Sequence, residues 1–225
     1  MPKTPQDYFA EGEALEARGK HEEAIEQWKK VRDSFPAPEL AARAELGIAD
    51  AQFANGSYIE AAAGYESFRK LHPTHEKAPY ALYRTGLSQL MQFDGIDRDQ
   101  TAVRAAAMSF ETYLRLYPKG AEAEEVRKKL EDATGKLAEH ELYVARFYLR
   151  TGKYAAAAAR VEELLRRQPR LSRPDEALFL LGSAYLMNGN AEGGRQIFQR
   201  LATEFPFSPF VAESQKALRV APAPK

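Results

Sequence analysis

The chain has 225 residues, of which 44% are hydrophobic and 28% charged, a composition typical of a globular protein with one or two domains. Lys plus Arg and Asp plus Glu number 32 each, so the summed charge favours neither nucleic acid nor an anionic membrane surface as a partner. The absence of cysteine excludes disulfides, thiolate metal sites and a cysteine nucleophile.

The two ends of the chain give little information about targeting. The opening MPKTPQ lacks the basic and then apolar pattern of a signal peptide, and no apolar run approaches the roughly 18 residues of a membrane span. The chain is therefore either cytoplasmic or a mature domain whose targeting segment has been removed. At the other end, residues 220–225 alternate Pro and Ala and predict a disordered tail.

One spacing recurs five times along the chain. It consists of Gly, a small residue five positions later, a large apolar residue nine later, an apolar residue twelve later and Pro seventeen later. The copies begin at Gly19, Gly56, Thr101, Gly152 and Gly189; the Thr101 copy lacks only the leading glycine. Gly ends a first helix in the left-handed conformation, the small residue lets a second helix approach, and Pro ends that second helix. The spacing therefore predicts five helix pairs.

This spacing resembles that of tetratricopeptide (TPR) repeats, and it predicts an all-α, right-handed TPR-like solenoid of five helix-turn-helix repeats. Seven positions before three of the glycines stand Gly12, Ala49 and Gly182, small residues where a first helix is expected to touch its partner. The aromatic residues of the second helices are expected in the core rather than in a cofactor site: Trp28, Tyr65 and Phe110.

The array is irregular in two places, because the five copies are separated by 37, 45, 51 and 37 residues. The first excess lies in MQFDGIDRDQT, residues 91–101, a loop insertion and hence a candidate contact site. The second lies between Pro118 and Gly152, in a segment rich in helix-forming residues. It predicts one long helix over residues 121–150 that opens the fourth repeat.

The histidines give weak evidence for metal binding. His72 and His75 have a possible ligand spacing but flank a proline that ends a repeat. His140 and Glu141 resemble the start of H-E-x-x-H, yet Val144 occupies the second histidine position, so no metal or catalytic site is predicted. Glu141 lies beside the apolar face of the long helix and, if partly buried, needs a hydrogen-bond or charge partner.

A binding surface is the more promising prediction, because the first helices of TPR arrays line a concave face. The inward positions of repeats one to three are Phe9, Glu13, Arg43, Asp50, Phe53, Tyr80, Tyr83 and Leu87. Aromatic anchors with a few polar groups suit an extended apolar peptide, although any of these aromatics could instead pack against a neighbouring repeat. A chaperone-type carboxylate clamp is not predicted, since only Arg84 matches its Lys, Asn and Arg positions.

Four stretches of the sequence narrow the resemblance to one family among TPR proteins. They are LHPTHEKAPYALYRTGL (residues 71–87), DRDQT (97–101), LAEHELYVARFYLRTGKY (137–154) and ARVEELL (159–165). Their order and spacing resemble those of BamD-type outer-membrane protein assembly lipoproteins, over residues 8–218.

The resemblance implies a non-enzymatic scaffold without cofactors, anchored by a lipid at the periplasmic face of the outer membrane. Residues 5–119, with repeats one to three, would receive targeting segments of unfolded barrel proteins through Phe9, Arg43, Asp50, Phe53, Tyr80, Tyr83 and Leu87. Residues 120–219 would dock on a POTRA domain of the barrel-forming partner. Arg160 matches an arginine that the family uses against an acidic group there, and the inserted Asp97, Arg98 and Asp99 are expected to join it. Other assembly lipoproteins are further expected partners.

Three departures from that family are visible. The lipid-bearing cysteine is missing, the family's YPFxPY is here FPAPEL (residues 35–40), and a run of five alanines precedes Arg160. Two alternatives remain: another periplasmic TPR adaptor, serving cell division or the envelope, or an enzyme that depends on His140.

Overall fold

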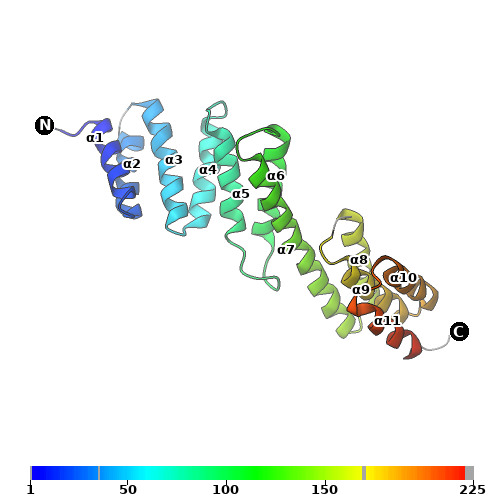
Figure 1. Cartoon of the computed structure of the whole chain (residues 1–225). Helices are drawn as coiled ribbons and strands as arrows, with labels where there is room; N and C mark the ends of the chain where they lie inside the picture. Colours follow the sequence, from blue (N-terminus) through cyan, green and yellow to red (C-terminus); the bar gives the residue numbers. More distant parts are fainter. Residues whose placement is uncertain (1, 35, 169–170, 221–225) are drawn as a thin grey trace. The chain divides into compact units, whose positions relative to one another are not determined.

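The computed structural model describes residues 2–34, 36–168 and 171–220 (Figure 1). These residues form eleven helices and no strand. The helices are α1 (Pro5–Glu16), α2 (His21–Ser34), α3 (Pro38–Ala54), α4 (Tyr58–Leu71), α5 (Ala78–Leu90), α6 (Thr101–Leu116), α7 (Ala123–Arg150), α8 (Tyr154–Arg167), α9 (Pro174–Met187), α10 (Ala191–Glu204) and α11 (Pro209–Val220). The chain is therefore all-α and TPR-like, as predicted. The helix α11, which packs on α9 and α10, lies beyond the five predicted pairs.

The chain divides into two compact units. The first runs from the N-terminus to Gly95 and includes Asp99–Thr134; the second joins Ile96–Arg98 to the chain from Gly135 onwards. The boundary at Thr134 lies inside α7, so this helix contributes its first part to one unit and its remainder to the other. The predicted division between residues 119 and 120 separates two proposed functions, and it stays a prediction.

The helix boundaries follow the glycine and proline pattern. Gly19, Gly56, Gly152 and Gly189 have φ angles of 71°, 80°, 75° and 86°, the left-handed conformation predicted for them. The long helix is also confirmed, since α7 has 28 residues and a length of about 42 Å. The predicted disordered tail begins at Val220, but this residue is the last of α11, so the prediction is wrong there. The rest of the predicted tail, residues 221–225, and the proline of the fourth copy at position 169 lie outside the described residues.

Close helix contacts are made by glycines that face buried rings. A Cβ atom added to Gly12 would lie 2.5 Å from Nε1 of Trp28, and one added to Gly182 would lie 2.5 Å from the ring of Phe198. Both rings are buried, as are the predicted core residues Tyr65 and Phe110. The close approach of these helices therefore depends on a glycine, which has no side chain, facing a large aromatic ring.

We expect Gly182→Ala to lower the free energy of unfolding by about 1–3 kcal/mol, because Phe198 would have to move within a filled core. Gly135→Ala is the matched control, since Gly135 lies within α7 and an added Cβ would meet no atom within 4 Å. This second change is expected to stabilise the protein by up to about 1 kcal/mol through helix propensity. Urea denaturation followed by circular dichroism measures both, and equal effects of the two substitutions would contradict the packing argument.

The core of the second unit holds a buried carboxylate. Ala138, Leu142 and Ala145 lie on the apolar face of α7, and they pack in one cluster with residues of α8 and α9. At the edge of this core, Glu176 in the first turn of α9 is buried and forms ion pairs with Arg146 of α7 and Arg173. The α7–α9 contact therefore combines apolar packing with an ion pair that the sequence did not indicate.

Candidate functional site

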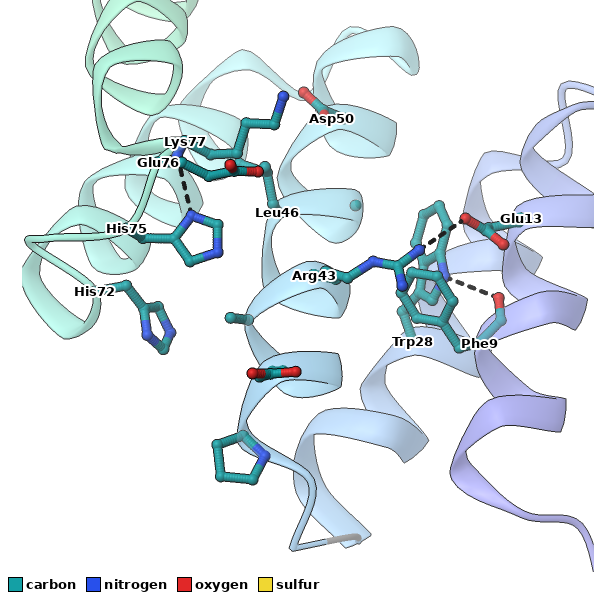
Figure 2. Close-up of a pocket in the computed structure, with 14 residues that line it drawn as sticks. Phe9, Glu13, Trp28, Arg43, Leu46, Asp50, His72, His75, Glu76 and Lys77 are labelled. Atoms are coloured by element: carbon teal, nitrogen blue, oxygen red, sulfur yellow. Dashed lines mark hydrogen bonds and ion pairs between the residues drawn. The ribbon is translucent and has the colours of Figure 1, made fainter.

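A groove in the first unit is lined by α1, α3 and the segment that joins α4 to α5. It has a volume of about 660 Å³. Its lining residues are Phe9, Glu13, Trp28, Pro38, Glu39, Ala42, Arg43, Leu46, Gly47, Asp50, His72, His75, Glu76 and Lys77. Figure 2 shows Arg43 and Leu46 on α3, with Phe9 and Glu13 on one side of them and His72 to Lys77 on the other. Helix α3 therefore supplies the floor, and the neighbouring elements supply the two walls.

The α1 wall is a stacked arrangement of one cation and aromatic rings. The guanidinium carbon of Arg43 lies 4.4 Å from the centre of the Phe9 ring, and its Nη2 lies 3.5 Å from a carboxylate oxygen of Glu13. Below them, Nε1 of Trp28 donates a hydrogen bond to the carbonyl of Phe9 over 3.3 Å. Arg43 is exposed while Phe9 is largely buried. The wall thus presents a cation above an apolar base.

The opposite wall contains two histidines, and one ring nitrogen of each has a hydrogen-bond partner within the protein. Nε2 of His72 lies 2.9 Å from a carboxylate oxygen of Glu45, and Nδ1 of His75 accepts the backbone N–H of Lys77 over 3.0 Å. Both rings also lie against Phe68, with centroid distances of 5.0 and 5.2 Å. Within the described ranges, no three His, Cys, Asp or Glu side chains gather as a metal site would require. The two histidines shape this wall through these contacts.

Beside the groove, a polar network fixes several predicted residues. Oδ1 of Asp50 accepts the hydroxyl groups of Tyr65 and Tyr80 over 2.5 and 2.7 Å. Arg84 donates from Nε to the Tyr65 hydroxyl over 3.0 Å and lies 3.9 Å above the Phe53 ring. Burial, and then the negative charge of Asp50, raise the pKa of both tyrosines well above the usual value. Arg84, the single match to a chaperone clamp, is therefore committed to this network.

The structure brings together only part of the predicted peptide surface. Phe9, Arg43 and Asp50 line the groove. Phe53 and Tyr80 join it indirectly through the Asp50 network, whereas Tyr83 is only 7% exposed and Leu87 is half-buried outside the groove. The lining residues that sequence reasoning missed include Glu39, Leu46 and Lys77. Glu39 and Leu46 could have been found, because they stand four before and three after Arg43 and share its helix face.

A second groove of about 510 Å³ lies next to the first and shares Glu76 and Lys77 with it. The rest of its lining consists of Pro79, Tyr80 and the segment from Tyr117 to Glu122. Under this segment, the hydroxyl of the buried Tyr113 donates to Glu122 over 2.6 Å. The two grooves therefore meet at the start of α5, and aromatic residues occur in both.

Tyr113, which lies under the segment from Tyr117 to Glu122, is expected to make the stability of the first unit depend on alkaline pH. Burial, and then the hydrogen bond to Glu122, raise the pKa of Tyr113 from 10.0 to about 12. Because the unfolded chain loses this proton first, stability is full below about pH 10 and falls as the pH rises to about 12. We expect Tyr113→Phe to reduce this alkaline loss by roughly 2 kcal/mol, measured by urea denaturation across the same range. Equal losses in both proteins would contradict the assignment.

The predicted docking residues lie on α8 and on the loop before α6. Nη1 of Arg160 donates to a carboxylate oxygen of Glu141 over 2.6 Å, which gives this half-buried glutamate the partner it was expected to need. Asp97, Arg98 and Asp99 are all exposed on the loop. Asp99 also accepts hydrogen bonds from the hydroxyl and the N–H of Thr101, over 2.9 and 3.3 Å, at the start of α6. The carboxylate of Asp99 is thus held against the first residue of that helix.

A comparison with models of protein families shows to which family the chain belongs. The family model described as "YfiO: Outer membrane lipoprotein" matches residues 1–196. The chain belongs to the YfiO family. This membership confirms the resemblance that the four sequence stretches indicated.

Among relatives, the YfiO chain is similar to the outer membrane protein assembly factor BamD of Neisseria meningitidis serogroup A, with 29% identity over 201 residues, 85% of this chain and 75% of the relative. BamD of Caulobacter vibrioides is 28% identical over 201 residues, 89% of this chain and 66% of the relative. A solved structure, the TPR2AB-domain:pHSP90 complex of yeast Sti1, is 13% identical with a TM-score of 0.46, covering 96% of this chain and 84% of that one.

Proposed function

We propose that this protein is a non-enzymatic assembly factor for outer-membrane β-barrel proteins. It receives targeting segments of unfolded barrel proteins in its first unit and docks through its second unit on a POTRA domain of the barrel-forming partner. The family match over residues 1–196 carries this proposal, together with relatives that are themselves named outer membrane protein assembly factors.

The proposed location is the periplasmic face of the outer membrane, with a lipid as the anchor and other assembly lipoproteins as neighbours. Among the described helices, none combines the length and the apolar composition that crossing a bilayer requires. Attachment in the proposed form would therefore depend on the lipid and on the protein partners.

The chemistry of the grooves supports an extended peptide as the ligand. The first groove combines apolar surface from Phe9, Trp28 and Leu46 with charges of both signs: the cations are Arg43 and Lys77, and the carboxylates are Glu13, Glu39, Asp50 and Glu76. Apolar side chains of a bound segment would occupy the apolar part, while its backbone carbonyls face the cations and its backbone N–H groups face the carboxylates. The shared border at Lys77 allows one segment to extend from this groove into the neighbouring one.

Photocrosslinking tests the peptide site. With benzoylphenylalanine at position 46, we expect crosslinks to a synthetic peptide that carries the last strand of an outer-membrane barrel protein. Ile59 is the matched control, because this α4 residue is 69% exposed and does not line the groove. Equal crosslinking at both positions, or none at position 46, would exclude the groove as the receiving site.

The docking proposal rests on Arg160. Arginine binds a carboxylate with paired N–H groups, so charge reversal should both remove the attraction and add repulsion. We expect Arg160→Glu to weaken binding to the purified POTRA domains by at least about tenfold, measured by isothermal titration calorimetry. Arg195→Glu on α10 is the control, since Arg195 is exposed and its ion pair with Glu192 is long, at 3.8 Å.

A wild-type affinity of the Arg160→Glu protein would remove Arg160 from the docking surface. A capture experiment from cell envelopes tests the wider function independently. Recovery of cell-division proteins without any barrel-assembly subunit would favour the alternative of a different periplasmic adaptor.

A further inference from the structure

The adjacent residues His140 and Glu141 of α7 each hold a different part of the second unit. Nδ1 of His140 lies 2.6 Å from the carbonyl oxygen of Ile96, and Glu141 accepts the hydrogen bond of Arg160. Since a carbonyl oxygen can only accept, Nδ1 of His140 carries the proton. The loop Ile96–Arg98 therefore belongs by contact to the second unit, although its flanking residues belong to the first.

The two contacts occur at the same level of one helix. Consecutive Cα atoms are about 3.8 Å apart, and consecutive side chains point about 100° apart around an α-helix. The loop and the guanidinium of Arg160 are thus fixed on neighbouring sides of the same turn of α7. This places the exposed Asp97 and Arg98 close to the level of Arg160.

Contacts within the second unit hold the guanidinium of Arg160 in place but engage only part of its hydrogen-bond donors. One of its N–H groups binds Glu141, and its guanidinium carbon lies 5.7 Å from the centre of the Tyr148 ring. A guanidinium has five donors, so a contact through Nη1 leaves further donors for an incoming carboxylate. Its side chain remains 35% exposed, so the remaining donors are within reach of a partner. Fixing a long side chain before binding reduces the entropy lost in the complex.

We propose that His140 and Glu141 are positioning residues that assemble one docking surface from Asp97, Arg98 and Arg160. The partner would carry a carboxylate opposite Arg160 and polar groups opposite the loop. This inference rests on the proposed docking function and adds residues that do not touch the partner. His140 and Glu141, which resemble half of a metal motif in the sequence, thus hold the loop and Arg160 in place.

Calorimetric titration of the full chain with the purified POTRA domains tests the role of Glu141. Glu141→Ala is expected to weaken binding about fivefold to thirtyfold. If Glu141 acts through Arg160, the same substitution should have no further effect in the Arg160→Ala protein. Glu162→Ala is the matched control on α8, because this exposed carboxylate binds Tyr185 and not Arg160. Glu141→Gln, which keeps the volume of the side chain, replaces Glu141→Ala if the latter does not fold.

The role of His140 has its own rescue experiment. His140→Ala is expected to weaken binding severalfold, and His140→Asn, whose amide N–H can reach the same carbonyl, should restore most of the affinity. Failure of asparagine to restore binding would overturn the role of the Nδ1 hydrogen bond.

Three results would overturn the role of Glu141. They are unchanged binding of Glu141→Ala, tighter binding, which would make Glu141 a competitor of the partner, and an equal loss in the Arg160→Ala background. If the wild-type chain does not bind the POTRA domains at all, the docking function itself is wrong. That result is distinct from the three above, which require a wild-type protein that binds.

Discussion

Arg146→Leu is expected to lower the free energy of unfolding of the second unit by about 3 kcal/mol or more. The side chain of Glu176 is only 4% exposed, and Arg146 is one of its two cationic partners. Removal of Arg146 would leave a buried carboxylate with Arg173 alone, whose own side chain is 51% exposed. Hydrogen exchange of the α9 amides, combined with urea denaturation, would locate and measure the loss.

Two further variants make this prediction specific. Arg195→Leu removes an exposed pair in the same unit, and exposed pairs contribute about 0–1 kcal/mol. The double variant Arg146→Leu, Glu176→Leu removes both charges, so it should be more stable than Arg146→Leu alone. If the double variant is less stable than the single one, the loss in Arg146→Leu arises from packing and not from an uncompensated charge.

Trp28→Ala is expected to lower the free energy of unfolding of the first unit by about 3–5 kcal/mol. The indole is 4% exposed and packs against two glycines: an added Cβ at Gly12 or Gly47 would lie 2.5 or 3.2 Å from it. Because these neighbours are backbone atoms of α1 and α3, they cannot fill the space that the substitution leaves. The substitution also removes the hydrogen bond to the carbonyl of Phe9.

Circular dichroism during urea denaturation measures this loss. Trp28→Phe should recover part of the stability, since a smaller ring still fills much of the space. Phe207→Ala is the control for loss of an aromatic residue, because Phe207 is fully exposed and its removal should change stability by about 0.5 kcal/mol or less. A similar effect of Trp28→Ala and Phe207→Ala would contradict the packing described for α1, α2 and α3.

The candidate site was predicted less completely than the fold. The sequence placed Phe9 and Tyr83 on a binding face, and each is only 7% exposed. Helical position tells which side of a helix a residue occupies, but the depth of a groove depends on the neighbouring helix and on the rotamers it imposes. Lys77 escaped prediction for a related reason: it lies just before α5, in a connection whose path the repeat spacing does not describe.

The histidines also show that spacing in the sequence does not identify the partners of a side chain. The spacing of His72 and His75 allowed a ligand pair, and only the structure shows Glu45 and the N–H of Lys77 as partners of their nitrogens. For Glu141 the sequence did predict that a partner exists, because a carboxylate that is partly buried needs a hydrogen bond or an opposite charge. It could not decide that the partner is Arg160, 19 residues away.

The sequence by itself determined the helix ends that glycine and proline mark, and which family the chain resembles. Glycine and proline act on their own backbone, so Gly19 and Gly152 end helices through φ angles of 71° and 75°, whatever packs around them. The tertiary structure alone decided the side-chain partnerships, such as Asp50 with Tyr80 and Arg146 with Glu176, each 30 residues apart. These partnerships depend on how helices rotate and approach one another, and that is set by packing over a whole unit.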